Sequence, residues 1–334
     1  SSLSPTTSVN MLAPTIRLSM ATRLTSVALL PVLATAYIST SFTPSTFAAR
    51  KAFHSLSRPS ALHTASPSVL PLSQRRPIAR GASALRSAYT TTEEGKFPSE
   101  EYRVFFKEDG KAISPWHDVD TWADKKNGIV NAIIEITKDT RPKMEVATKE
   151  ETNPIKQDMK KGKLRDYPLD IYWNYGMIPK TWENPKAEHP EMKAFGDNDP
   201  VDIVEIGSKP IARGTICKIK AVGTLAMIDE GELDWKVIGV STEDPKCKDI
   251  SSVADMEKAF PGQIDAIREW FRNYKSDGKF EGGKWVDITE GQNSFGLGEE
   301  CKDMKYTAEV IDETVEQYEA LMAGKVDADG LSLK

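Results

Sequence analysis

Cysteine is scarce in this sequence, with three residues among 334, and this scarcity limits the classes of protein that it can encode. Cys217, Cys247 and Cys301 are widely spaced and form neither a CxxC nor a CxxH pair. An odd number of isolated cysteines argues against a disulfide framework and against a zinc ribbon. This usage fits a reducing compartment best, and we expect the three thiols to be buried and inert.

Long apolar runs and internal repeats are also missing. The longest nearly unbroken apolar stretch, Val27 to Ala36, is about half of a membrane span. Glycine and proline show no collagen period, and no repeat is visible. Because 39% of the residues are hydrophobic and 28% are charged, the composition predicts a folded protein with a sizeable core and no membrane-spanning helix.

Acidic residues are absent from positions 1–92, which contain nine basic residues and 30 serines and threonines. The net charge of −5 therefore combines +9 in this segment with −14 in the remainder. Such a composition is typical of a targeting leader and offers little from which to build a core. We divide the chain into a disordered targeting leader, 1–92, and one folded domain, 93–334.

The leader itself has two parts. Met20, a plausible start, is followed by a positive charge at Arg23, an apolar stretch over 27–33 and a small-x-small site at 34–36, the layout of a secretory signal peptide. Residues 37–92 are rich in Arg and Ser, which is typical of a transit peptide. Together they predict two-step import into a plastid bounded by extra membranes, with the chloroplast stroma as destination. A mitochondrial presequence or a plain basic arm is the alternative.

The domain reads as strands first and helices later. Strand patterns cover 102–107, 129–137, 143–148, 201–206, 216–226 and 236–240. Ser252 stands three residues before Asp255 in the pattern of a capping box, and Pro261 restarts a helix with an apolar face that includes Tyr274. A last helix follows from the apolar spacing over 304–322. This order predicts an α+β domain, a mostly antiparallel sheet or small barrel with helices packed outside it.

Three carboxylates crowd the segment 195–202, at Asp197, Asp199 and Asp202. Such crowding is costly unless cations neutralise it, and carboxylate oxygens are the ligands that Mg²⁺ prefers. A calcium-binding EF-hand loop is excluded, because Asp202 replaces its invariant Gly and Ser208 its terminal Glu. The segment therefore predicts a magnesium site.

Further acids flank the apolar strand patterns. One group is the acidic turn 229–234, and another is Glu135 and Glu145, with Lys143 on the same face as Glu145 if that segment is extended. Taken singly, each group fits a solvated turn, since most Asp and Glu are exposed. Their positions at strand ends allow several of them to converge at one mouth of a barrel.

In these segments the sequence resembles the family I soluble inorganic pyrophosphatases of eukaryotic type, from about residue 102 to about residue 325. The segment 196–202 (GDNDPVD) resembles the family signature. The other matching segments are 149–155 (KEETNPI), 160–165 (KKGKLR), 174–176 (NYG), 229–231 (DEG), 234–236 (DWK) and 270–275 (WFRNYK). The resemblance implies a five-stranded OB-like β-barrel with outer helices. It also implies Mg²⁺-dependent hydrolysis of pyrophosphate to two phosphates, which removes the pyrophosphate made in biosynthesis.

The resemblance further implies roles for individual residues around several Mg²⁺ ions. Asp197, Asp202 and Asp234 hold the first ion, Asp202 is shared with a second, and Asp229, Asp234 and Glu145 bind others. Asp199 takes a proton from the attacking water, and Glu135 is an acid behind the ligands. The implied phosphate ligands are Lys143, Arg165, Tyr175, Lys236, Tyr274 and Lys275. Tyr175 is also counted as catalytic; Tyr274 could instead be a core residue, because it lies on an apolar helix face.

Two departures from the family pattern stand out. The segment between Arg165 and Tyr175 is shorter than in long-loop fungal members, and 136–140 reads ITKDT where dimeric relatives carry an Arg-Trp pair. Both a monomer and a homodimer therefore remain open.

Two rival functions fit the sequence less well. A haloacid-dehalogenase-type phosphatase would use Asp197 and Asp199, but its motif should follow a strand of a parallel sheet directly, and here a polar segment precedes it. A nucleic-acid-binding OB module conflicts with the charge of −14, because such binding needs a basic surface. We expect pyrophosphate as the partner, and neither nucleic acid nor membrane.

Overall fold

The computed structural model describes residues 89–334. The predicted signal and transit peptides lie outside the described residues, except that strand β1 (Tyr89–Glu94) begins before the predicted boundary at 93. Within the described part, no helix is both long enough and apolar enough to span a membrane.

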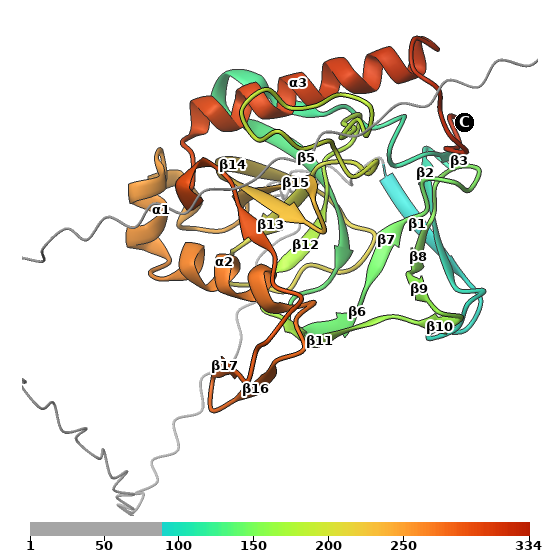
Figure 1. The fold of residues 1–334 in the computed structure, drawn as a ribbon. Helices are drawn as coiled ribbons and strands as arrows, with labels where there is room; N and C mark the ends of the chain where they lie inside the picture. The colour runs from blue at the N-terminus through green and yellow to red at the C-terminus, as the bar shows by residue number, and fades with distance from the viewer. Residues whose placement is uncertain (1–88) are drawn as a thin grey trace, which may run out of the picture. The chain divides into compact units, whose positions relative to one another are not determined.

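Five strands form a ring of pairings at the centre of the domain (Figure 1). They are β5 (Ile129–Ile136), β12 (Asn174–Met177), β13 (Asp202–Glu205), β14 (Ile216–Asp229) and β15 (Glu232–Ser241). β12 pairs with β5 and β13, β13 runs parallel to β15, and β14 pairs with both β15 and β5. The succession of pairs therefore returns to the strand where it began. Two short strands extend the sheet: β4 (Trp122–Asp124) beside β5 and β18 (Ser294–Phe295) beside β14.

Shorter strands surround this ring. A second sheet contains β1 with β2 (Arg103–Glu108), β3 (Lys111–Ile113), β7 (Met144–Val146) and β8 (Ile155–Gln157). Three two-stranded ribbons consist of β6 (Thr140–Pro142) with β11 (Asp166–Ile171), β9 (Met159–Lys160) with β10 (Lys163–Leu164), and β16 (Lys279–Glu281) with β17 (Lys284–Val286). The β16–β17 hairpin projects away from the rest of the domain at the bottom of Figure 1.

Three α-helices lie outside the ring: α1 (Val253–Ala259), α2 (Gln263–Asn273) and α3 (Met304–Met322). The expected cap is present, since the Ser252 side chain accepts a hydrogen bond from the backbone N–H of Asp255 at the start of α1. Asp303 caps α3 in the same way. Short 3-10 turns occur at Lys125–Asn127, Cys247–Asp249 and Leu297–Glu299. The α+β prediction is confirmed at this level, although β16, β17 and β18 fall between α2 and α3.

Both faces of the central strands are buried, which explains their nearly continuous apolar sequences. Ile133 on β5 joins a large cluster that also contains Phe271 of α2, whereas Ile134 joins a second cluster with Val310 and Ile311 of α3. Successive strand residues point to opposite faces, so α2 and α3 cover different sides of the same strand. Each buried Ile contributes about 1.5–3 kcal/mol relative to an exposed one.

The three cysteines form no disulfide in the described part of the chain. Cys247 is buried, whereas Cys217 and Cys301 are half-buried, so the prediction of three buried thiols is only partly right. Burial raises the pKa of Cys217 and of Cys301 to about 12. Because the thiolate is the reactive form, these thiols are poor nucleophiles at neutral pH.

Candidate active site

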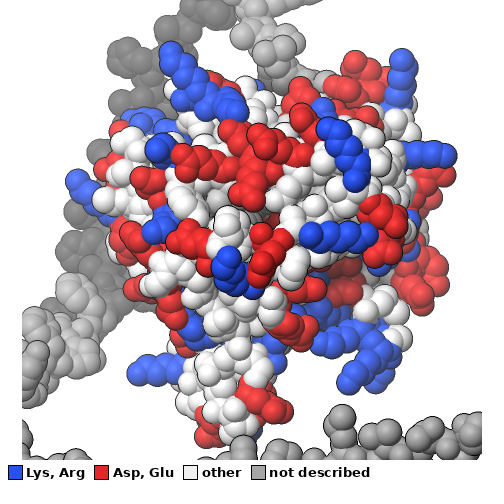
Figure 2. Space-filling model, turned by 45° about the horizontal axis from the view of Figure 1, so that its top comes forward, with Lys and Arg blue, Asp and Glu red and all other residues white. Residues whose placement is uncertain are grey.

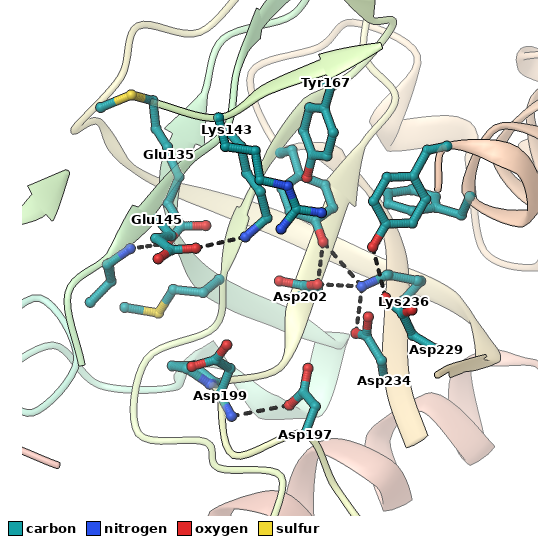
Figure 3. A pocket seen from close by; sticks show the side chains of 18 of the residues that line it. Glu135, Lys143, Glu145, Tyr167, Asp197, Asp199, Asp202, Asp229, Asp234 and Lys236 are labelled. Atoms are coloured by element: carbon teal, nitrogen blue, oxygen red, sulfur yellow. Dashed lines mark hydrogen bonds and ion pairs between the residues drawn. The ribbon is translucent and has the colours of Figure 1, made fainter. Parts of the chain in front are cut away.

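A polar cavity of 210 Å³ opens beside the ring of strands (Figure 3). Nine acidic and four basic side chains line it, together with three tyrosines. The predicted site residues all line this cavity: Glu135, Lys143, Glu145, Arg165, Tyr175, Asp197, Asp199, Asp202, Asp229, Asp234, Lys236, Tyr274 and Lys275. The structure therefore brings together acids and bases that are up to 140 positions apart in the sequence.

Strand register places the central charges of this cavity. β13 pairs in parallel with β15, so Asp202, the first residue of β13, lies directly opposite Lys236. Asp234 lies two residues before Lys236 on β15 and therefore on the same face. The β14–β15 hairpin carries Asp229 at its turn. The chain folds this way because apolar residues alternate with these charges and hold the strands in the core.

Lys236 is the hub of this group, and its side chain is 2% exposed. Its ammonium donates hydrogen bonds to Asp202, to Asp234 and to the hydroxyl of Tyr175. The Tyr175 hydroxyl in turn donates to Asp202 (Figure 3). Burial opposes the charge of Lys236, but the two carboxylates outweigh it and raise its pKa well above the usual value. Lys236 therefore stays charged, and burial keeps the pKa of Tyr175 raised so that it stays a donor.

A second basic group lies at another wall of the cavity. Lys143 donates to Glu145 at 2.6 Å and forms an ion pair with Asp158 at 3.4 Å. Arg165 donates to the same Asp158 at 2.9 Å. Asp158 was not among the predicted site residues. Its ion pairs hold Lys143 and Arg165, two predicted phosphate ligands, beside one another. These contacts come from the tertiary fold and not from a sequence motif.

The end of α2 supplies a third group. Tyr274 follows the last residue of α2, and its hydroxyl donates to Asp229 at 2.7 Å. Lys275 donates to the other oxygen of Asp229 at 2.7 Å. Tyr274 is thus a polar lining residue, although its ring also stacks on Trp270 with centroids 5.4 Å apart. The ring of Tyr274 therefore packs against α2, while its hydroxyl lies at the cavity.

The acidic loop before β13 carries two carboxyl groups with raised pKa values, Asp197 and Asp199. Reduced solvation, followed by repulsion from Asp234, raises the pKa of Asp197 well above its usual value. Asp199 is open to solvent at the cavity, yet reduced solvation by the surrounding protein and repulsion from Glu145 raise its pKa to about 7. The backbone N–H of Asp199 donates to the Asp197 carboxylate at 3.0 Å. A carboxyl with a pKa near 7 is suited to exchange protons at neutral pH.

Glu135 is a buried lining residue of the cavity. It is 5% exposed and accepts a hydrogen bond from the backbone N–H of Val146 at 2.6 Å. Burial and then repulsion from Asp202 raise its pKa well above the usual value.

Two further polar residues at the site were not predicted. Tyr167 on β11 lines the cavity and is 4% exposed, and Figure 3 shows its hydroxyl directed inward. It belongs to the segment that departs from the family pattern, so no motif marks it. Glu183 is buried next to the carboxylates of Asp197 and Asp234. It follows Trp182 in a segment without strand or helix periodicity, and only the tertiary fold brings it to the acids.

The carboxylate oxygens of the cavity are a suitable set of ligands for cations. Nine carboxyl groups face four basic side chains in the cavity, so positive charge is missing. Oxygen ligands of this kind suit a hard divalent cation. The same residues leave Lys, Arg and tyrosine donors for an anion with several oxygens.

Fold and site together define an enzyme that uses divalent cations and basic side chains on a small phosphate-like anion. The family model for inorganic pyrophosphatase matches residues 132–319, more than half of the chain. The chain therefore belongs to the inorganic pyrophosphatase family, whose enzymes hydrolyse pyrophosphate to phosphate.

Named relatives and solved structures agree with this family. The chain is 49% identical over 254 residues to soluble inorganic pyrophosphatase 1, chloroplastic, of Chlamydomonas reinhardtii, covering 75% of this chain and 86% of that protein. It is 50% identical over 245 residues to soluble inorganic pyrophosphatase 6, chloroplastic, of Arabidopsis thaliana, covering 72% and 77%. The crystal structure of type I inorganic pyrophosphatase from Toxoplasma gondii is similar with a TM-score of 0.64 and 37% identity, covering 70% of this chain and 99% of that one. Neither rival function is supported by these similarities.

Proposed function

We propose that this chain hydrolyses pyrophosphate to two phosphates with Mg²⁺ by direct attack of water, without a covalent intermediate. One observation carries the proposal: nine carboxyl groups, four basic side chains and three phenols line a single cavity. Phosphoryl transfer depends mainly on positioning and on charge stabilisation, which this set provides. No Ser, Cys or His lines the cavity in the described part of the chain.

The carboxylates divide between cation binding and proton transfer. Asp197, Asp202 and Asp234 would hold one Mg²⁺, and Asp229 and Glu145 would contribute to others. Bound Mg²⁺ supplies charge neutralisation on the phosphate oxygens and a more acidic water. Lys236 now donates to Asp202 and Asp234; with a cation on these acids, its ammonium is available to a phosphate oxygen.

Asp199 would act as the base that takes the proton of the attacking water. Within residues 89–334, no Lys or Arg side chain forms an ion pair with its carboxylate, and its pKa of about 7 matches neutral conditions. Its backbone is held in place, because the N–H of Glu183 donates to the Asp199 carbonyl at 2.9 Å. Position and acidity both support this role.

The basic side chains and phenols would bind the substrate. Arg165 can hold two phosphate oxygens at once, whereas each Lys contributes a point charge. Tyr175 and Tyr274 have raised pKa values through burial and nearby acids, so both remain hydrogen-bond donors. The ligands in this proposal are Lys143, Arg165, Tyr175, Lys236, Tyr274 and Lys275.

Finer features of the protein are proposed on the same basis. The ring of five strands corresponds to the OB-like barrel with outer helices. The chloroplastic names of two relatives support a plastid location, where removal of pyrophosphate would pull biosynthetic reactions forward. Acidic side chains gather near the middle of the face in Figure 2, with basic ones between them, which opposes nucleic-acid binding.

A phosphate-release assay tests the proposed function directly. We expect rapid release of two phosphates per pyrophosphate with Mg²⁺, loss of release in EDTA, and little release from ATP under the same conditions. Release that does not depend on a divalent cation, or equal release from ATP, would contradict the proposal.

A further inference from the structure

Glu183 connects the acidic loop to the central sheet. Its side chain is 3% exposed, and its Oε1 accepts a hydrogen bond from the backbone N–H of Trp235 at 2.8 Å. Trp235 is the residue between Asp234 and Lys236 on β15. The carboxylate of Glu183 is therefore tied to the strand that carries two site residues.

The backbone of Glu183 is tied to the acidic loop as well. Its N–H donates to the carbonyl of Asp199 at 2.9 Å, and its carbonyl accepts from the N–H of Asn198 at 2.9 Å. Gly196 approaches so closely that a Cβ there would lie 2.3 Å from the carbonyl carbon of Glu183. Close packing without a side chain at Gly196 fixes the loop against Glu183.

The Glu183 carboxylate lies beside two other carboxylates, and one of its oxygens has no hydrogen-bond partner within residues 89–334. One carboxylate oxygen from each of Glu183, Asp197 and Asp234 lies within 4.8 Å of the others. Oε2 of Glu183 is buried and has no hydrogen-bond partner within residues 89–334. A buried acceptor left without a partner destabilises the folded protein. Lys236 donates to Asp234 but makes no hydrogen bond to Glu183 in the described structure.

Two explanations of the unpartnered Oε2 differ in the role that they give to Glu183: support of the loop alone, or binding of a cation. If Glu183 only braced the loop, the bond from Trp235 and the backbone bonds would suffice, and an uncharged amide would serve as well. A carboxylate among carboxylates is instead favourable when a cation lies between them. Mg²⁺ usually keeps several bound waters, and such a water can donate a hydrogen bond to Oε2 of Glu183.

We propose that Glu183 is part of the cation site, where Oε2 binds, through a water, the Mg²⁺ held by Asp197 and Asp234. This inference rests on the proposed magnesium site and adds to it a residue from a different segment of the chain. Glu183 acts as a positioning residue, because it touches the ligand set and the hydration of the cation rather than the pyrophosphate.

The experiment measures Mg²⁺ binding by calorimetry without pyrophosphate, at fixed pH, for the wild type and Glu183→Gln. Loss of a residue that supports a metal ligand typically weakens metal affinity by about 10- to 100-fold, and we expect a loss in this range. Glu183→Gln keeps the size of the side chain and the acceptor for Trp235. Glu183→Asp, which keeps the charge but withdraws the oxygen, should also weaken binding and serves if the amide variant fails to fold.

Glu205→Gln is the matched control. Glu205 is 1% exposed on β13, but both of its oxygens have partners: Oε1 accepts from Gly207 and Ser241, and Oε2 accepts from Asn174. It lies at the opposite end of β13 from Asp202. We expect its substitution to leave the Mg²⁺ affinity unchanged, even if it lowers stability.

A further variant separates this inference from the proposed function. Asp197→Asn removes a proposed direct ligand and should weaken Mg²⁺ binding at least as much as Glu183→Gln. We expect Glu183→Gln to lose about 10-fold or more in Mg²⁺ affinity. If its affinity stays within about twofold of the wild type while Asp197→Asn weakens binding, the role of Glu183 is refuted. If Asp197→Asn itself binds Mg²⁺ normally, the proposed magnesium site is refuted.

Discussion

At the scale of single residues, the site works by setting charges against one another inside a cavity with little solvent. Lys236 is nearly buried but stays charged because Asp202 and Asp234 accept its hydrogen bonds. Asp199 forms no ion pair with a basic side chain within residues 89–334, and reduced solvation with repulsion from Glu145 raises its pKa to about 7. These different surroundings are the basis for the proposal that most of the carboxylates bind cations whereas Asp199 accepts a proton.

Tyr167 offers a test of a residue that no motif marks. Its ring is held edge-on against Trp270 at 4.9 Å, and burial raises its pKa, so the hydroxyl remains a donor inside the cavity. If this hydroxyl binds phosphate, Tyr167→Phe should lower kcat/KM for pyrophosphate by about 10- to 100-fold, the worth of one hydrogen bond to a charged group.

Tyr172→Phe is the control for this substitution. Tyr172 lies 38% exposed, next to Trp173, and does not line the cavity. Steady-state kinetics of both variants should show a loss only for Tyr167→Phe. Equal kinetics for the two variants would mean that the Tyr167 hydroxyl does not meet the substrate.

At the scale of elements, close approach between strands sets the shape of the site. β12 carries Tyr175, and the next residue, Gly176, pairs with Ile134 of β5. A Cβ at Gly176 would lie 1.8 Å from the carbonyl oxygen of Ile133, closer than any contact allows. Only glycine therefore lets β12 pack against β5 and place Tyr175 in the cavity.

Gly176→Ala should consequently destabilise the protein by about 3 kcal/mol or more, because neither strand can move without breaking the ring. Gly282→Ala provides the comparison: Gly282 has φ of +58° and no atom within 4 Å of an added Cβ. Its substitution should cost only about 1 kcal/mol, from the left-handed backbone alone. Chemical unfolding measures both; a Gly176→Ala variant as stable as Gly282→Ala would contradict this packing.

The sequence predicted the elements whose patterns are long and regular. β5, β14, β15, α2 and α3 were found, with ends shifted by a few residues. β12 was missed because it has four residues and includes a glycine, and its existence depends on pairing with β5 and β13. The 13 predicted site residues all line one cavity, and ten of them lie in segments that resemble the family motifs. Glu183 and Asp158 act only through tertiary contacts, which no local pattern records.

At the scale of the whole molecule, the cavity makes folding depend on pH and on cations. The acids at the site with raised pKa values are Glu135, Glu183, Asp197, Asp199 and Asp234. Because their pKa values are higher in the folded state, the folded protein binds more protons than the unfolded chain between about pH 4 and the folded values. Those values are about 7 for Asp199 and Asp234.

The free energy of unfolding without cations should therefore fall as pH rises through this window, by about 1.4 kcal/mol per pH unit for each extra proton bound. His117, whose pKa burial lowers, has the opposite sign but is a single group. Mg²⁺ favours the charged acids and should flatten the slope. Chemical unfolding between about pH 5 and 8, with EDTA and with Mg²⁺, measures this. Stability that rises with pH in EDTA would show that these acids are not strained.

The most direct test of the central claim, a magnesium site with a separate base, is turnover of Asp199→Asn measured against both Mg²⁺ concentration and pH. Asn keeps the size of the side chain but cannot take a proton, so turnover should fall by about 10²- to 10⁴-fold, the usual worth of a positioned general base. The Mg²⁺ dependence should stay near that of the wild type, and raised pH should restore part of the rate. Near-normal turnover, or full rescue by added Mg²⁺, would contradict the assignment of Asp199 as the base.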